Sequence, residues 1–352
     1  MLYDSPLWIS DVMAEMKTLP ELCQLENKSV LITGASGLIC SAVVDLLIAY
    51  NEEHKGNIRI YLAGRSRKRM DARFGVYMDR EYMTFVQYDA SRAGNQFEFE
   101  VDYIIHGASN AFPTLIMKQP VETMEENILG LMELLRYAAQ VGAKRVLYIS
   151  SSEVYGQNKT LEPFSETEYG FIDLLNPRNS YSVGKRAAET LCASYAAEYG
   201  VESVTVRPGH IYGPTASLKD NRVSSSFAYA AAKGKNLVMK SDGAQLRSYC
   251  YCVDCASAIL KVLLCGENLN AYNISNSDSI ISIRQMAELL AKAGGVQLIV
   301  NAPTESEKKA FNPMSNSSLK SEKLEALGWH GLFDAETGLT HTVEILAKVD
   351  TK

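Results

Sequence analysis

Short apolar runs that alternate with helical patterns constrain the fold of this chain more than any other feature. Between the apolar runs, side chains such as Leu38, Val43 and Leu47 recur at helical spacing. The runs with the composition of buried strands cover residues 29–33, 58–64, 84–90, 102–109 and 145–150. Strands and helices in alternation, joined by short turns, indicate a parallel sheet covered on both faces. The sequence therefore predicts an α/β fold with a Rossmann-like, doubly wound parallel sheet.

The second half of the chain continues with a long helix and further short strands, and no obvious linker separates them. We expect helices at 182–200, 281–294 and 318–329, and strands at 201–208, 236–242 and 248–254. The predicted domains are an N-terminal helical extension (1–28), an NAD(P)-binding Rossmann domain (29–208 plus about 245–275) and a smaller, interleaved C-terminal substrate domain (209–244 and 276–352). Spaced apolar residues in the extension indicate an amphipathic segment, which packs either on the body or on a second subunit.

The composition excludes several classes of partner. A net charge of −6 without a long basic run gives no electrostatic reason to expect nucleic acid or an anionic membrane. The odd number of cysteines, 7, suits a reducing cytosol better than a disulfide framework. Cys250, Cys252 and Cys255 lie close together, but no second Cys/His cluster is near, so we expect no metal site. The chain start has no signal-peptide pattern and no run reaches membrane-spanning length, so we expect a cytoplasmic protein.

A glycine-rich turn, TGASGLIC, joins the first predicted strand to the first predicted helix at residues 33–40. Its glycines permit the tight turn and the close backbone approach that a pyrophosphate needs at a helix N-terminus. Cys40 stands where a third glycine is usual, at a position that governs helix packing more than phosphate contact. The turn predicts NAD or NADP as cofactor, held by Gly34, Ser36, Gly37, Leu38 and Ile39.

The end of the second predicted strand leaves the choice between NAD and NADP open. An acidic residue there usually holds the ribose 2′-hydroxyl, but the sequence reads LAGRSRKR. Arg65, Ser66 and Arg67 could bind a 2′-phosphate, which favours NADP. Alternatively, Arg65 stacks on the adenine and the other side chains form a solvated face.

Tyr181 and Lys185 form a Tyr-x-x-x-Lys pattern near the start of a predicted long helix. Residues four apart lie on one face of a helix. The Lys185 ammonium would favour the Tyr181 phenolate and lower its pKa toward neutrality, which would make it a general base for a sugar hydroxyl.

These motifs together resemble the extended short-chain dehydrogenase/reductase family, the NAD-dependent epimerase/dehydratases that act on nucleotide sugars. The resemblance rests on TGASGLIC, HGAS, SSSEVYG, YSVGK and RPGHIYGP in this order and covers roughly residues 29–345. It implies that Ser151 hydrogen-bonds the reacting sugar oxygen, that Tyr181 is the base, and that Lys185 is its partner. It also implies a tightly bound, recycled cofactor contacted by Arg65, Asp89, Ala90, Ala108, Ser109, Tyr181, Lys185 and Arg207.

Within that family, the chain is most similar to UDP-glucuronate decarboxylases. Ser152 and Glu153 stand before Val-Tyr-Gly, whereas 4,6-dehydratases carry an Asp-Glu pair there. Loss of that aspartate argues against 4,6-dehydration, and the resemblance makes Glu153 a catalytic acid/base. It also assigns Ser152, Arg178, Arg222 and Arg247 to the substrate. Two departures are Ile116, where the decarboxylases have a tyrosine, and residues 311–314, where they have Arg-Lys-Pro-Asp.

The predicted function is a redox-neutral cycle on a nucleotide-linked sugar, with UDP as the expected nucleotide, that passes through a 4-keto intermediate. Decarboxylation of UDP-glucuronate fits best; a 4-epimerase, a 4,6-dehydratase and a keto-sugar reductase are alternatives. A non-enzymatic cofactor-sensing protein is a further alternative, although such proteins typically lose the Tyr and Lys that are present here. The resemblance implies a homodimer through helices that begin near Val121 and Ser182. We expect structural roles for His106 and Asn127, and for Asp89 either an adenine contact or a turn cap.

Overall fold

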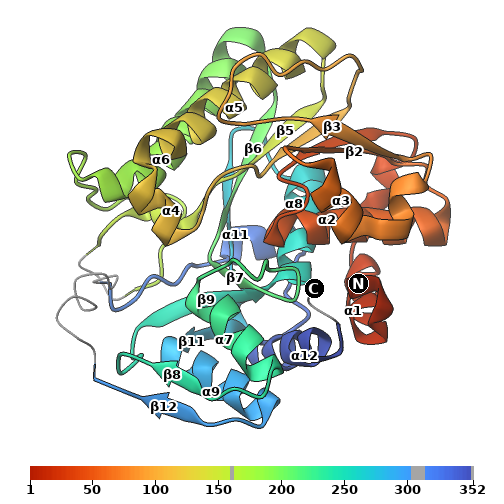
Figure 1. The fold of residues 1–352 in the computed structure, drawn as a ribbon. Helices are drawn as coiled ribbons and strands as arrows, with labels where there is room; N and C mark the ends of the chain where they lie inside the picture. The colour runs from red at the N-terminus through yellow and green to blue at the C-terminus, as the bar shows by residue number, and fades with distance from the viewer. Residues whose placement is uncertain (159–161, 303–313, 350–352) are drawn as a thin grey trace.

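The computed structural model describes residues 1–158, 162–302 and 314–349, and its central element is a parallel sheet (Figure 1). Its strands are β1 (Ser29–Thr33), β2 (Arg59–Gly64), β3 (Met83–Gln87), β4 (Tyr103–His106), β5 (Arg145–Ile149), β6 (Ser203–Pro208) and β10 (Ala271–Ile274). They lie in the order β10-β6-β5-β4-β1-β2-β3, and every pairing is parallel. The order reverses between β1 and β4, so this sheet has a topological switch point there.

Helices cover both faces of this sheet. In β1, Val30 and Ile32 belong to the core that includes residues of α2 (Leu38–His54) and α8 (Cys252–Cys265). Leu31 belongs instead to the core with α5 (Pro120–Val141) and α6 (Ser180–Tyr199). Successive side chains of a strand point to opposite faces, and here both faces are buried. The predicted doubly wound α/β fold is confirmed.

A smaller set of strands and helices lies below the main sheet in Figure 1. One sheet has β7 (His210–Tyr212), β9 (Leu246–Tyr251) and β11 (Ile280–Ser282); another pairs β8 (Leu237–Met239) with β12 (Leu298–Val300). The helices here are α7 (Val223–Ala232), α9 (Ile283–Gly294) and α12 (Ala335–Lys348). Of the segment 245–275, β9 therefore belongs to a small sheet and β10 to the large one. The domain boundaries stay a prediction.

Two helices differ from the sequence-based expectation. The basic stretch after β2 contains α3 (Arg67–Phe74), which begins at the N-cap Ser66 and buries Met70 and Phe74. Charged residues hide this pair of apolar positions in the sequence. The helix predicted at 318–329 is a single turn, α11 (Glu322–Glu325). Before it, Leu319 pairs with Phe164 in a β-bridge, and after it Gly328 has a φ of 84° that ends the turn.

The N-terminal extension packs on the body of the same chain, which decides between the two predicted placements. Its helix α1 (Pro6–Met16) buries Trp8 completely. Asp11, one turn before Glu15, accepts a hydrogen bond from the Tyr251 hydroxyl of β9 at 2.9 Å. His341 of α12 lies 3.0 Å from the same carboxylate. Helix α1 therefore contacts a strand and a helix of the smaller part of the fold.

A second carboxyl group of α1 is buried against α8. Glu15 is 0% exposed and accepts a hydrogen bond from Ser257, whose hydroxyl also accepts one from Trp329 at 2.8 Å. Asp254 of α8 faces Glu15 and accepts from the amides of Leu332 and Phe333. Burial raises the pKa of Glu15 to about 7. Burial, together with the charge of Glu15, also raises the pKa of Asp254. This carboxyl pair therefore retains a proton in the folded protein at neutral pH.

We expect this pair to make the stability of the protein fall as the pH rises. The pKa of Glu15 increases from 4.5 to about 7 on folding, so the stabilisation is complete below about pH 4.5 and is lost as the pH passes 7. Glu15→Gln stays neutral and should remove about 2 kcal/mol of this pH dependence. Urea unfolding between pH 5 and about pH 8 measures it, with the exposed Glu53→Gln of α2 as control. Equal slopes for wild type and Glu15→Gln would contradict the expectation.

Candidate functional site

The predicted site residues gather at the carboxyl edge of the large sheet. Because the strands are parallel, the residues after β1, β4 and β5 lie along one edge, next to the switch point. The glycine turn follows β1, Ala108 and Ser109 follow β4, and Ser151 follows β5. Helix α6 brings Tyr181 and Lys185 to the same edge, because the Lys185 ammonium donates to the Ile149 carbonyl at the end of β5 and Tyr181 lies one helical turn before Lys185.

The glycine turn after β1 is a narrow backbone cradle. Gly34 has a φ of 69°, and a Cβ at this position would lie 2.9 Å from the carbonyl carbon and oxygen of Gly107. Gly37 is the N-cap of α2, and a Cβ on it would lie 3.1 Å from the Gly34 oxygen. The amides of Leu38 and Ile39 belong to the first helical turn, where N–H groups lack helical partners. Together with Ser36, these residues fit the pyrophosphate of a dinucleotide.

Cys40 replaces the third glycine of the usual pattern, and the structure contains the compensating change. A Cβ on Gly107, at the end of β4, would lie 2.4 Å from the Cys40 sulfur. The missing side chain of Gly107 therefore makes room for the thiol, which is buried. The close approach of α2 to the sheet is preserved although the glycine is not.

The residues predicted to contact the adenosine of the cofactor, Arg65, Asp89 and Ala90, follow the strands β2 and β3. Arg65 is half exposed and its guanidinium lies 3.9 Å from the Glu126 carboxylate of α5. Asp89 accepts hydrogen bonds from the Ser91 amide at 3.1 Å and the Ser91 hydroxyl at 2.8 Å. Asp89 thus caps the turn after β3, one of its two expected roles. Neighbouring Ala90 packs closely on α5 at Gly130.

Hydrogen bonds around Thr33 join the ends of β1 and β4. The Thr33 hydroxyl accepts from the amides of Gly107 and Ala108, each at 3.2 Å, and shares a 2.7 Å hydrogen bond with His106. Burial and, second, the charge of Lys185 lower the pKa of His106 to about 3. The imidazole is therefore neutral at physiological pH, in keeping with the structural role expected for it.

Asn127 of α5 is hydrogen-bonded to residues at the carboxyl ends of β4 and β5. Its amide nitrogen donates to the Thr123 carbonyl at 2.7 Å, and its amide oxygen accepts from Ser109 at 3.2 Å and Tyr148 at 3.3 Å. The predicted cofactor residue Ser109 is thereby fixed to the helix behind the loop. This geometry agrees with the structural support expected of Asn127.

The four residues predicted to be catalytic form one cluster between β5 and α6. The Ser151 hydroxyl faces Tyr181 and accepts from the Glu153 amide at 3.2 Å, which caps a 3₁₀ turn (Ser152–Tyr155). The Lys185 ammonium donates to the Ile149 carbonyl at 2.8 Å and lies 5.6 Å from the centre of the Tyr181 ring. A hydroxyl, a phenol, an ammonium and a carboxylate thus converge at the end of β5.

The electrostatics of Tyr181 differ from the sequence-based expectation. Burial, followed by the negative charge of Glu153, raises the pKa of Tyr181 to about 12. Burial also lowers the pKa of Lys185 to about 7. The expectation that Lys185 lowers the phenol pKa toward neutrality is wrong for this structure, because the ammonium is desolvated and faces the Ile149 carbonyl. The opposing, stabilising contributions to the phenolate come from the Ser151 hydrogen bond, Arg222 and Arg178.

The predicted substrate arginines come from separate segments of the chain. Arg178 pairs with Glu153. Arg222, the N-cap of α7, donates to both carboxylate oxygens of Asp220 at 2.9 and 3.0 Å. Arg247 of β9 is 3% exposed and donates to the Leu246 and Met314 carbonyls at 2.7 and 3.3 Å. Ser152 lies in the 3₁₀ turn, and residues 311–313 lie outside the described part of the chain.

His210 of β7 is a functional candidate that the sequence analysis missed. Its Nδ1 is buried and has no hydrogen-bond partner within the described residues. Burial, then the charges of Arg247 and Arg222, lower the pKa of His210 to about 3. A neutral imidazole with an unpaired nitrogen beside two guanidinium groups suits an anionic ligand such as a diphosphate. A single histidine in RPGHIYGP gives no sequence pattern that could have revealed this.

Arg207, which the sequence analysis assigned to the cofactor, is occupied elsewhere. Its guanidinium donates to both oxygens of Glu189 at 3.0 and 2.6 Å, and to the Tyr155 hydroxyl, the Tyr169 hydroxyl and the Glu166 carbonyl at 3.0, 2.7 and 2.8 Å. An arginine has five N–H donors, and these contacts use all of them. Arg207 therefore stabilises the segment after β5, and we remove it from the cofactor site.

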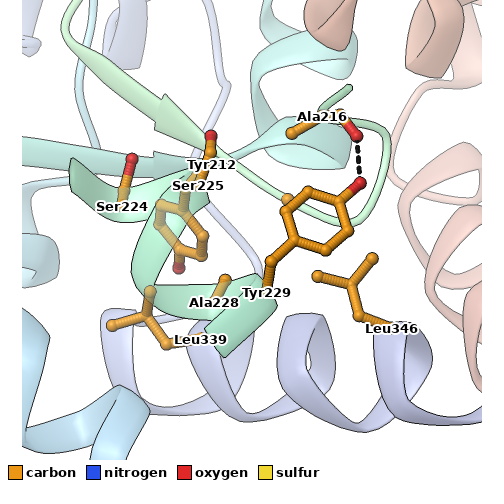
Figure 2. Close-up of a pocket in the computed structure, with 9 residues that line it drawn as sticks. Tyr212, Ala216, Ser224, Ser225, Ala228, Tyr229, Leu339 and Leu346 are labelled. Carbon is orange, nitrogen blue, oxygen red and sulfur yellow. Dashed lines mark hydrogen bonds between the residues drawn. The ribbon is translucent and has the colours of Figure 1, made fainter. Parts of the chain in front are cut away.

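A pocket in the smaller part of the fold lies apart from this cluster (Figure 2). Its lining comes from β7, α7 and α12, with Tyr212, Ala228 and Leu339 among the residues. The Tyr229 hydroxyl crosses it to the Ala216 carbonyl. None of the predicted catalytic or cofactor residues lines this pocket.

Neither a metal site nor a membrane span is apparent in the described parts of the chain. No group of three or more His, Cys, Asp or Glu side chains there could hold a metal ion. No helix in those ranges is both long and apolar enough to cross a membrane. All cysteines of the sequence fall within the described ranges, and each is a free thiol.

Comparison with known proteins identifies the family. The sequence model of the NAD dependent epimerase/dehydratase family matches residues 30–275. The chain belongs to this family. It is 30% identical to a UDP-glucuronic acid decarboxylase 1 from Xenopus tropicalis over 331 residues, which are 93% of this chain and 74% of that protein. It is also 30% identical to UDP-glucuronic acid decarboxylase 3 from Arabidopsis thaliana, over 91% of this chain and 89% of the relative.

Solved structures share the fold of this family member. A UDP-glucose 4-epimerase from Thermotoga maritima matches with a TM-score of 0.75 and 23% identity, over 91% of this chain and 99% of that chain. A dTDP-glucose 4,6-dehydratase from Bacillus anthracis, crystallised with NAD, matches with a TM-score of 0.75 and 20% identity, over 92% and 97%. At these identities the likeness establishes the fold.

We expect the cradle glycine to be essential for dinucleotide binding. In Gly34→Ala, the new methyl group would collide with Gly107, so NAD affinity measured by calorimetry should fall by at least about tenfold. Gly295→Ala is a matched control, because Gly295 has a similar φ of 63° but no atom within 4 Å of its Cβ position. Both variants should lose about 1 kcal/mol of stability from backbone strain. Equal NAD affinity in both variants would exclude the cradle as the pyrophosphate site.

Proposed function

We propose that this protein decarboxylates UDP-glucuronate through a 4-keto intermediate. The observation that supports this most directly is the position of Glu153, whose carboxylate lies in the same cluster as Tyr181 and Ser151. A dehydratase would need an acid at position 152 to protonate the departing hydroxyl, and this chain has Ser152 there. The decarboxylase relatives, which align over more than nine-tenths of the chain, support the same assignment.

The first step is oxidation of the sugar at carbon 4. Ser151 would hold the 4-hydroxyl oxygen while Tyr181, which it faces, removes the proton. A bound NAD would supply the hydride acceptor for carbon 4 and a positive charge that favours the ionised phenol. Lys185 orients the end of β5 through the Ile149 carbonyl, and thereby fixes the distance between Ser151 and Tyr181.

The second step is loss of carbon dioxide. A ketone at carbon 4 makes the carboxylate at carbon 5 part of a β-keto acid, whose C–C bond breaks to give carbon dioxide and an enolate. Glu153 manages the proton that carbon 5 then receives, directly or through an oriented water. When the ketone is reduced again, Tyr181 would return its proton to the oxygen at carbon 4, so the cycle would leave the cofactor without net change.

The diphosphate of the substrate would bind near Arg222, Arg247 and His210, in the smaller part of the fold. Arg222 and Arg247 supply guanidinium groups, and the unpaired Nδ1 of His210 lies in their field. Both arginines already have protein partners, which hold their side chains in place before the ligand arrives.

A 4-epimerase is the second candidate, and one departure in the sequence favours it. The decarboxylases have a tyrosine where this chain has Ile116, which is buried in α4 (Pro113–Lys118). A site that lacks a polar group near the sugar suits a substrate without a carboxylate. An epimerase would use the same Ser151, Tyr181 and Lys185 but would turn the 4-keto sugar over before hydride return.

We further propose a cytoplasmic homodimer. Helices α5 and α6 lie side by side at the outer face of the large sheet (Figure 1), where a second copy could complete a four-helix contact. Val121, near the start of α5, is 64% exposed, and Tyr199, the last residue of α6, is 59% exposed. These apolar surfaces would be buried in such a dimer.

Incubation of the holoenzyme with UDP-glucuronate tests the proposed reaction. We expect release of carbon dioxide and formation of a UDP-pentose, without net change of absorbance near 340 nm. Tyr181→Phe removes the base and should lower turnover at least about 100-fold. An epimer without gas would assign the 4-epimerase activity instead, and stoichiometric consumption of reduced cofactor would assign a reductase.

A further inference from the structure

Glu153 is held by two side chains for which the proposed reaction gives no role. Its Oε2 accepts a hydrogen bond from the Ser182 hydroxyl at 3.0 Å. The two terminal nitrogens of Arg178 lie 3.4 Å from Oε2 and Oε1 respectively. Ser182 is the residue after Tyr181 on α6, and Arg178 belongs to the 3₁₀ turn (Pro177–Asn179) that leads into this helix. The orientation of the Glu153 carboxylate is therefore tied to the segment 178–182, which also carries Tyr181.

The arrangement constrains one side of the carboxylate and leaves the other open. Ser182 is 5% exposed, whereas the side chains of Glu153 and Arg178 are 39% and 36% exposed. An ion pair as exposed as this contributes little to folding stability. The geometry around Glu153 is therefore better explained by what the carboxylate does than by folding stability.

Both neighbours of Glu153 donate to its carboxylate. The Ser182 hydroxyl and the Arg178 guanidinium, which can only donate, contact its two oxygens. The charge of Glu153 opposes ionisation of Tyr181, while the charge of Arg178 favours it. Arg178 thus offsets the cost of having a carboxylate next to the base.

Several other polar groups surround the Tyr181 phenol. Around Tyr181 lie Ser151 from the turn after β5, Tyr148 from β5, Lys185 from α6 and Arg222 from the N-terminus of α7, in addition to Glu153 and Arg178. Glu153 is the anionic side chain of this set. Arg178 is the cation of this set that contacts Glu153.

We propose that Ser182 and Arg178 are positioning residues, which hold the Glu153 carboxylate in a fixed orientation beside Tyr181. Arg178 then acts through Glu153. This differs from the sequence-based prediction, in which Arg178 binds the substrate. This proposal rests on the proposed function only in requiring that Tyr181 is the base when carbon 4 of a nucleotide sugar is oxidised. It does not depend on whether decarboxylation or epimerisation follows.

The test is single-turnover reduction of the bound cofactor by the nucleotide sugar that the wild-type holoenzyme accepts, followed as a function of pH. Arg178→Met should lower this rate about tenfold at pH 7 and move the acidic limb of the profile upward by about one pH unit, because the Glu153 charge is no longer offset. KM should change less than about twofold. A tenfold rise of KM with an unmoved pH profile would overturn the proposal and return Arg178 to the substrate.

A double variant isolates the route through Glu153. If Arg178 acts through this carboxylate, Arg178→Met in a Glu153→Gln background should lower the rate less than about threefold. The same tenfold loss in both backgrounds would overturn the proposal. Ser182→Ala should slow cofactor reduction, and Ser182→Thr, which keeps a hydroxyl, should restore most of the rate; an equal loss in both would contradict the role of the hydroxyl.

Matched controls separate these effects from folding and from the proposed function. Ser194→Ala on the exposed face of α6 and Arg284→Met in the surface pair with Glu288 should leave the rate and the pH profile unchanged. Thermal unfolding of every variant should stay within a few degrees of wild type. If no nucleotide sugar reduces the cofactor of the wild type, the proposed function fails; if wild type reacts but the variants lack the stated pattern, the positioning role fails.

Discussion

The hydrogen bonds of the Thr33 hydroxyl are the constraint on which the active-site edge depends. They tie the amides after β4 to the end of β1 at the switch point of the sheet, so two loops approach closely enough to touch through their backbones. This closeness excludes a side chain at Gly34, which shapes the cradle for the pyrophosphate. The absence of a side chain on Gly107 leaves room for the Cys40 thiol of α2.

The glycine turn is shaped by backbone packing, whereas the cluster of predicted catalytic residues is shaped by electrostatics, because it brings ionisable groups together in a buried place. Tyr181 and Lys185 both have pKa values shifted by burial toward their neutral forms, and Glu153 adds a charge that opposes the phenolate. In the proposed reaction Tyr181 must lose a proton, which burial and Glu153 oppose. Arg178 and Arg222 favour that loss from the protein, and the positive charge of an oxidised cofactor would favour it further.

Sequence patterns predicted the parts of this structure that are periodic or locally encoded. The strands β1 to β6 and the turn at Gly34 follow from apolar runs and glycine spacing, and the Tyr181 to Lys185 spacing follows from helical geometry. Three features could not be predicted, because they depend on partners distant in sequence. The direction of the Tyr181 pKa shift requires its burial, the network of Arg207 requires the fold of the segment after β5, and the unpaired nitrogen of His210 requires the positions of Arg222 and Arg247.

The N-terminal extension shows the same dependence on distant partners and has a consequence for the active-site edge. The carboxylate of Asp11 contacts Tyr251 and His341 in the smaller part of the fold, whereas Glu15 contacts Ser257 of α8, which packs on the large sheet. Helix α1 therefore joins the two parts of the molecule with buried polar contacts. Arg222 and Arg247 come from the smaller part and Tyr181 from the larger. The relative position of these parts decides whether the arginines stand near the phenol, so the extension contributes to the geometry of a site that it does not touch.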